Sequence, residues 1–216
     1  MVTGKILGGS TLLEKVTRAA GARCVAAFKG ARQHVPRSSV HELQALIERE
    51  NADSRIGFGG GSPIDTCKVA SHLFLEKREI IQIAIPTTLY AAEYTYGGGV
   101  TDEKTLVKSV VSDPRLQPRT VINDPELTLR TPEWLWVATG MRALDHAIET
   151  IYAKRHHPLS NALGTKAISL LVEHLKPSIE TSTAEQLAHR GECQFAAVTR
   201  VQIPSGTPNL FRNLRA

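Results

Sequence analysis

The hydrophobic positions of the first 85 residues follow two spacings in turn, one typical of helices and one typical of buried strands. Segments with apolar residues three and four apart alternate with short runs that are almost wholly apolar. Runs of the second kind are typical of a parallel sheet that is covered on both faces. The alternation predicts an α/β fold with a doubly wound sheet. The expected helices lie at 11–20, 40–47 and 63–75, and the expected strands at 23–28, 55–58 and 80–85.

The pattern changes after Thr88. Three consecutive glycines at 97–99 and the segment 105–111 predict an irregular hairpin, and 120–122 predicts a further short strand. Beyond Thr131 only helical spacing remains, so we expect the rest of the chain to be helical. The later helices are expected to start at Pro132, with an interruption at Gly140, and to continue over 158–175 and 184–198.

Two proline-containing pairs, Asp124-Pro125 and Thr131-Pro132, punctuate the chain where the sheet pattern ends. We therefore expect a domain boundary near 125–131. After about 197 the helical periodicity stops, and three prolines and glycines fall close together. The expected division is an α/β domain at 1–128 that lacks its first strand, a partial helical domain at 129–197 and a tail at 198–216.

The composition is that of a globular protein, with 42% hydrophobic and 22% charged residues. No apolar run approaches the length of a membrane-spanning helix, and the N-terminus lacks the basic-then-apolar pattern of a secretory signal. We therefore expect no membrane partner. The three cysteines have no paired spacing, which argues against a disulfide framework and favours a reducing compartment, by default the cytoplasm.

The net charge of +5 is concentrated near one end of the chain. Residues 198–216 contain three arginines and no acidic residue, which leaves +2 for residues 1–197. That larger part shows no stripe of basic residues with interleaved aromatics. The charge pattern therefore argues against a nucleic-acid surface.

A glycine-rich turn, Gly-Gly-Gly-Ser-Pro-Ile-Asp over 59–65, follows one expected strand and opens the next helix. Three residues without a Cβ let a phosphate approach the backbone closely. Ser62 suits the N-cap, Pro63 the first helical position and Asp65 the first turn, so the helix start would offer N–H groups to a pyrophosphate. A tight strand-to-helix connection without a ligand explains the same residues, and one glycine motif does not decide between the two.

Five separated motifs follow one another along the chain: 59–65 with Lys68, 85–88 with Glu93, Asp102 with Lys108, 124–128, and 140–149. In this order they resemble the iron-containing (group III) alcohol dehydrogenases, a family that includes glycerol dehydrogenases and maleylacetate reductases. The segment 30–36 looks most like the maleylacetate reductase branch. The resemblance covers residues 7–197, and the agreement of five motifs in sequence makes it specific.

The resemblance implies an N-terminal dinucleotide-binding parallel-sheet domain followed by an all-helical domain, here incomplete, with the substrate between them. It implies NAD or NADP as the cofactor, and residues 29–32 do not distinguish the two. From chemistry alone, Lys108 would be a solvated surface amine, whereas the resemblance places it near the nicotinamide ribose. The cofactor-binding residues carried over from the family are Gly59, Gly60, Gly61, Ser62, Asp65, Thr87, Thr88 and Lys108.

The resemblance also points to Arg142 and His146 as catalytic residues, and four residues of separation puts them on one helix face. Metal-dependent members carry an aspartate at the position of Arg142, where it binds the metal together with the histidine. A cation repels a metal ion, and Asp145 lies on the wrong side of the helix to replace the carboxylate. We therefore expect no metal. Arg142 either grips a substrate carboxylate or forms an ion pair with Asp145 or Glu149.

The sequence therefore predicts an NAD(P)-dependent oxidoreductase that transfers hydride between the nicotinamide and an alcohol or carbonyl, or a maleylacetate-like substrate. The motif order looks cut at both ends, so a catalytically inactive nucleotide-binding fragment from a truncated or mis-predicted gene is the alternative. A helical interaction module formed by 131–197 is a third, less supported class. We expect a small-molecule substrate, no nucleic acid, and a homodimer as the candidate assembly.

Overall fold

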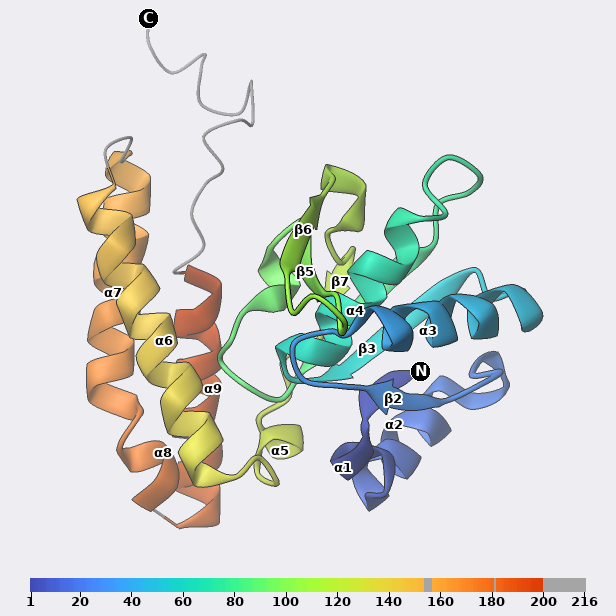
Figure 1. The fold of residues 1–216 in the computed structure, drawn as a ribbon. Coiled ribbons are helices and arrows are strands. Elements are labelled where there is room, and N and C mark those ends of the chain that lie inside the picture. The colour runs from blue at the N-terminus through green and yellow to red at the C-terminus, as the bar shows by residue number, and fades with distance from the viewer. Residues whose placement is uncertain (154–156, 181, 200–216) are drawn as a thin grey trace, which may run out of the picture.

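The computed structural model describes residues 1–153, 157–180 and 182–199. Figure 1 shows a sheet packed with helices and, beside it, a group of long helices. The sheet has five strands, all parallel, in the order β2-β1-β3-β4-β7. Parallel neighbours need crossover connections, which explains the alternation of apolar patterns in the sequence. The strands are β1 (Val2–Gly4), β2 (Phe28–Ala31), β3 (Ser54–Gly59), β4 (Ile81–Pro86) and β7 (Thr120–Val121).

Two apolar layers cover the faces of the sheet. On one face, α3 and α4 bury Leu43 and Cys67 in a core that also contains Phe28. On the other face, Leu13 of α2 packs with Phe58 of β3. Successive strand residues point to opposite faces, so this part of the chain needs an apolar residue at almost every strand position. The first four helices are α1 (Lys5–Gly8), α2 (Thr11–Ala20), α3 (Arg37–Arg49) and α4 (Gly61–His72).

A separate two-stranded hairpin lies beside α4. Its strands are antiparallel and pair from Gly97 with Ser112 to Thr101 with Lys108. The hairpin confirms the prediction for this irregular stretch. It is formed by β5 (Gly97–Thr101) and β6 (Lys108–Ser112), and the short 3₁₀ turns are η1 (Gly21–Arg23), η2 (Ala92–Tyr94) and η3 (Pro114–Leu116).

The last described part of the chain is helical, as predicted. Small and apolar residues of the three long helices form one buried cluster, which includes Trp136, Ala167 and Cys193. Among the described residues, no helix has both the length and the apolar character needed to cross a bilayer. The helices are α5 (Pro125–Thr128), α6 (Glu133–Tyr152), α7 (Pro158–His174), α8 (Pro177–Glu180) and α9 (Thr183–Thr199).

A buried arginine on α9, Arg190, connects four of these helices. Its Nη1 donates to the carbonyl of Thr128 at 2.5 Å and its Nε to the carbonyl of Ser178 at 3.2 Å. The guanidinium lies 4.5 Å from the centroid of the Trp136 ring. The side chain is only 1% exposed, so these contacts replace its solvation.

Several element boundaries differ from the prediction. The strand expected at 23–28 is shifted, because β2 begins only at Phe28. The N-terminal strand β1 was not predicted, since three residues are too few to show a period. Residues 200–216, which make up most of the predicted tail, lie outside the described residues.

Two helix predictions are also wrong in detail. The serines at 38 and 39 do not cap α3, which begins at Arg37 after Pro36. Ser39 instead donates to the carbonyl of Gly30 at 2.5 Å. Gly140 does not interrupt α6. A Cβ at Gly140 would lie 2.5 Å from Leu175 Cδ1, so the glycine lets two helices approach each other closely.

Candidate functional site

The glycine-rich turn lies at the carboxyl end of β3 and leads directly into α4. Gly59 ends the strand with φ +134°, a conformation that side chains rarely adopt. Its carbonyl accepts a hydrogen bond of 2.9 Å from the backbone N–H of Thr87, at the neighbouring end of β4. The turn therefore lies where two parallel strands end, which is the usual place for ligands in open α/β sheets.

The start of α4 has no side-chain cap. The N-cap residue is Gly60, and the helix begins at Gly61. The prediction that Ser62 is the N-cap is therefore wrong, because Ser62 lies inside the first turn. Its carbonyl accepts a hydrogen bond of 2.7 Å from Thr66 Oγ1. Gly60 has no side chain to cap the first N–H groups, so the helix start keeps donors for an anion.

The two predicted threonines lie against this turn from the end of β4. Both are buried, Thr87 and Thr88 being 3% and 6% exposed. The carbonyl of Thr87 accepts a hydrogen bond of 2.7 Å from Thr131 Oγ1. A Cβ at Gly60 would lie 3.3 Å from Thr88 Cγ2, so Thr88 packs directly on the glycine turn. The structure thus brings the predicted glycines and threonines together.

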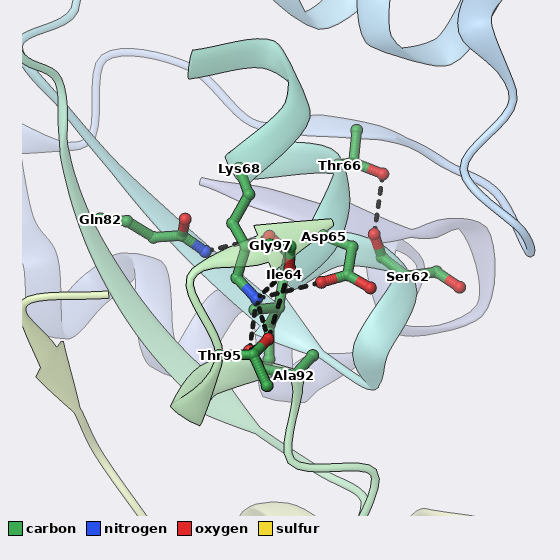
Figure 2. Close-up of polar contacts among 9 residues, drawn as sticks. All are labelled: Ser62, Ile64, Asp65, Thr66, Lys68, Gln82, Ala92, Thr95 and Gly97. Atoms are coloured by element: carbon green, nitrogen blue, oxygen red, sulfur yellow. Dashed lines mark hydrogen bonds and ion pairs between the residues drawn. The ribbon is translucent and has the colours of Figure 1, made fainter. Parts of the chain in front are cut away.

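Asp65 and Lys108 lie on different elements, and the charge of Lys108 acts on the Asp65 carboxylate. The Asp65 carboxylate on α4 accepts a hydrogen bond of 3.2 Å from Lys68 Nζ, and Figure 2 shows this contact. Burial raises the pKa of Asp65, whereas the charges of Lys68 and Lys108 act in the opposite direction. Lys108 is exposed on β6, and its side chain lies over Gly99. Its influence on Asp65 supports a place beside the predicted site.

Arg142 and His146 lie on α6, one turn apart, and both are accessible. Among the described residues, Arg142 forms no ion pair with Asp145 or Glu149. Its guanidinium instead stacks 4.7 Å from the centroid of the Tyr90 ring. His146 Nε2 lies 4.0 Å from a carboxylate oxygen of Glu149, and its side chain is 30% exposed. Of the two interpretations of Arg142, the ion pair is therefore not observed.

Tyr90 was missed by the sequence analysis, yet it connects the two halves of the site. A Cβ at Gly61 would lie 2.5 Å from Tyr90 Cδ1, so the ring packs on the first residue of α4. The guanidinium of Arg142 lies over the same ring. In the sequence Tyr90 is one aromatic residue between Leu89 and Ala91, and nothing in this local pattern indicates the contact. The glycine turn and the predicted catalytic residue are thus neighbours through one side chain.

Comparison with known proteins decides the family. The family model described as "Iron-containing alcohol dehydrogenase" matches residues 1–125, more than half of the chain. The protein belongs to the iron-containing alcohol dehydrogenases. The NAD-dependent methanol dehydrogenase of Bacillus methanolicus is 34% identical over 197 residues, and the match covers 83% of this chain and 51% of the relative.

Other members of the iron-containing alcohol dehydrogenases agree with this assignment. The maleylacetate reductase of Burkholderia cepacia is 35% identical over 184 residues, with 85% of this chain and 50% of the relative covered. This match confirms the likeness to the maleylacetate reductase branch. The crystal structure of an alcohol dehydrogenase from Oenococcus oeni superposes with a TM-score of 0.83 at 27% identity, covering 92% of this chain and 56% of the other. The chain spans about half the length of the curated relatives it matches.

The family name raises the question of iron, and the side chains around His146 do not fit a metal centre. The side chain one turn before it is the cation Arg142, which is held by the Tyr90 ring. Within the described residues, no group of three or more histidine, cysteine, aspartate or glutamate side chains is placed to hold a metal ion. A stable transition-metal site needs several such ligands. No step of the proposed chemistry is therefore assigned to a metal.

Proposed function

We propose that this chain binds a nicotinamide dinucleotide at the glycine turn and forms part of an NAD(P)-dependent oxidoreductase. The observation that carries the proposal is the uncapped start of α4 at Gly60 and Gly61, at the carboxyl edge of the sheet. A pyrophosphate at this point would accept hydrogen bonds from backbone N–H groups and meet the positive end of the helix dipole. The family assignment of the chain supports the same ligand.

Side chains around the turn supply the further contacts that a dinucleotide needs. Thr88 offers a hydroxyl group beside Gly60, and the backbone N–H of Thr87 is bonded to the carbonyl of Gly59. The partly exposed carboxylate of Asp65 is suited to accept hydrogen bonds from ribose hydroxyl groups, and Lys108 adds a positive charge on the hairpin side. The nicotinamide supplies the hydride chemistry, while the protein contributes binding, orientation and electrostatics.

On the substrate side, we assign Arg142 to a carboxylate group and His146 to the reacting carbonyl. The guanidinium has a planar fork suited to bidentate contact with a carboxylate, and it lies over the Tyr90 ring. His146 lies one turn further along α6 with 30% of its side chain exposed, and would donate a hydrogen bond to a carbonyl oxygen. A small carboxylated carbonyl compound or a maleylacetate-like molecule fits both contacts.

Arg32 is the residue that a 2′-phosphate of NADP would meet, because it directly follows β2. Its Nη2 donates to Ser38 Oγ at 2.5 Å, and Glu42 and Glu103 lie 3.7 Å from the guanidinium. The two carboxylates already compensate the charge of Arg32, which weakens its attraction for a further anion. We therefore infer that NAD is accepted, in agreement with the NAD-dependent relative, and NADP is to be tested beside it.

Fluorescence titration with NADH and NADPH tests the proposal directly. Gly60→Val should remove dinucleotide binding and leave the helical content measured by circular dichroism unchanged, because its side chain would occupy the space between the turn and Thr88. Gly191→Ala on α9 is the control and should bind like the parent, since a Cβ there meets only Pro125 Cγ at 3.4 Å. Equal NADH affinity of the parent and Gly60→Val would refute the assignment.

A second candidate, a dinucleotide-binding chain without turnover, is favoured by one observation. Arg142 lies one turn before His146, where the metal-dependent pattern described above requires a carboxylate. A turnover assay with NADH and an aldehyde or maleylacetate distinguishes the two candidates. NADH oxidation that depends on the added substrate supports the enzyme, and binding without oxidation supports the second candidate.

A further inference from the structure

Lys68 lies on α4, one turn after Asp65, and its side chain is 0% exposed. Figure 2 shows its Nζ among four acceptors. It donates to Asp65 Oδ1 at 3.2 Å, Thr95 Oγ1 at 2.9 Å, the carbonyl of Gly97 at 3.0 Å, and the carbonyl of Ala92. An ammonium group has three protons for these four acceptors, so its capacity to donate is fully used.

Three of the four acceptors belong to the segment 92–97, which leads from η2 into β5. This strand runs directly over α4. A Cβ at Gly98 would lie 3.1 Å from Val69 Cγ2 and 3.3 Å from the carbonyl oxygen of Asp65. At Gly98 no side chain separates β5 from α4, and the Lys68 ammonium connects α4 with the segment that leads into β5.

The charge of Lys68 is tied to that of Asp65. Burying an ammonium is costly unless a carboxylate and hydrogen-bond acceptors replace its water. Burial lowers the pKa of Lys68, and Asp65 is the main group that opposes this effect, followed by Glu93. Burial raises the pKa of Asp65, and Lys68 is the main group that opposes it, followed by Lys108. Each member of the pair therefore favours the ionised form of the other.

We propose that Lys68 is a positioning residue of the dinucleotide site, which holds the Asp65 carboxylate in place for the cofactor. This inference rests on the proposed function, in which Asp65 and Lys108 line that site. An apolar side chain could fill the same volume, but it would leave the carboxylate without its partner and the carbonyls of segment 92–97 without a donor. Lys68 thereby acts on the cofactor through other residues.

The test compares Lys68→Met, Asp65→Asn and the double variant in NADH titrations of the full chain. Lys68→Met should weaken NADH binding at least tenfold, and Lys166→Met, an exposed lysine on α7, should stay within twofold of the parent. Asp65→Asn should also weaken binding. The double variant should bind within about twofold of Asp65→Asn, because residues that act as one unit give non-additive losses. Circular dichroism and thermal melting report whether each variant is folded.

The pH dependence supplies a readout that a purely structural lysine would not move. The groups around Asp65 are Lys68 on its own helix, Lys108 from β6 and, beside Lys68, Glu93 from η2. Ionised Asp65 is the form that accepts hydrogen bonds, so NADH affinity should fall as the pH drops through the pKa of Asp65. Removing Lys68 raises that pKa further, and the fall should therefore occur at a higher pH in Lys68→Met.

The outcomes are distinguishable. If the parent binds neither NADH nor NADPH, the proposed function is refuted together with this inference. If the parent binds and Lys68→Met binds equally well, only the inference fails. Losses that multiply in the double variant, with no change in the pH midpoint, would assign Lys68 a structural role alone. If Lys68→Met does not fold, the comparison of Asp65→Asn with the double variant decides, and a further large loss in the double variant refutes the inference.

Discussion

Replacing Gly59 by alanine should destabilise the fold, whereas the same change at Gly60 should mainly affect ligand binding. The two glycines are adjacent, and their backbones differ. Gly59 has φ +134°, which is accessible almost only to glycine, and Gly60 has φ −77°, which any residue adopts. Gly59 is therefore needed for its backbone conformation, whereas Gly60 is needed only for the space that a side chain would fill.

The magnitude for Gly59→Ala follows from three contributions. Backbone strain of this kind amounts to about 1–3 kcal/mol. The new methyl group would lie 3.1 Å from Pro63 Cγ and 3.2 Å from Leu7 Cδ1, and we assign this crowding about 1 kcal/mol. Alanine also lowers the conformational entropy of the unfolded chain, which opposes this loss by about 0.4–1 kcal/mol. The free energy of unfolding should fall by about 2 kcal/mol.

For Gly60→Ala the nearest atoms belong to Thr88, with Cγ2 at 3.3 Å and Oγ1 at 3.4 Å from the new Cβ. A shift of a few tenths of an ångström in this side chain relieves the contact, so the stability loss should stay below about 1 kcal/mol. NADH affinity should nevertheless drop about tenfold, because the methyl group crowds the Thr88 hydroxyl, which the proposed function places beside the phosphates.

Urea unfolding followed by far-UV circular dichroism measures the stability of both variants, and NADH fluorescence measures binding. Gly191→Ala serves as the control for replacing a glycine without strain or close contact. A Gly59→Ala protein that unfolds at the same urea concentration as the parent would show that the strand end tolerates a side chain. Unchanged NADH affinity in Gly60→Ala would contradict the placement of the phosphate.

Further predictions concern the helical part and the metal. Arg190→Met should lower the free energy of unfolding by about 2–4 kcal/mol, because the buried carbonyls of Thr128 and Ser178 lose their donor. Urea unfolding followed by tryptophan fluorescence measures this loss, and a loss below about 1 kcal/mol would contradict the prediction. Arg142→Met should change the free energy of unfolding by less than about 1 kcal/mol, since the cation–π contact of Arg142 is exposed. The variant should raise the KM of a carboxylated substrate, and an unchanged KM would contradict the role assigned to Arg142. Elemental analysis after dialysis should find well under one equivalent of iron or zinc, and a retained stoichiometric metal lost in His146→Ala would overturn the metal assignment.

The sequence predicted the elements whose pattern is local and long. The strand β4 and the helices α7 and α9 were placed within one or two residues, because apolar periods extend over their whole lengths. The antiparallel hairpin was recognised from its glycines and turn residues. The short strand β1 and the start of β2 were not, since pairing with neighbouring strands decides both.

The site was predictable as far as its motifs reached. The glycines and threonines were identified from the sequence and lie together in the structure, although Ser62 does not cap the helix. The positions of Tyr90 and Lys68 were beyond sequence reasoning. Each of the two side chains connects segments more than twenty residues apart, and nothing in the local pattern around an aromatic or a lysine reveals such a contact.

The four bonds of the Lys68 ammonium have a consequence for protein engineering. They tie the helix that follows the glycine turn to the segment 92–97, which leads into β5. A design that grafts only the glycine sequence and its helix onto another sheet would introduce a buried lysine without most of its acceptors. A graft that also carries the segment 92–97 avoids that defect.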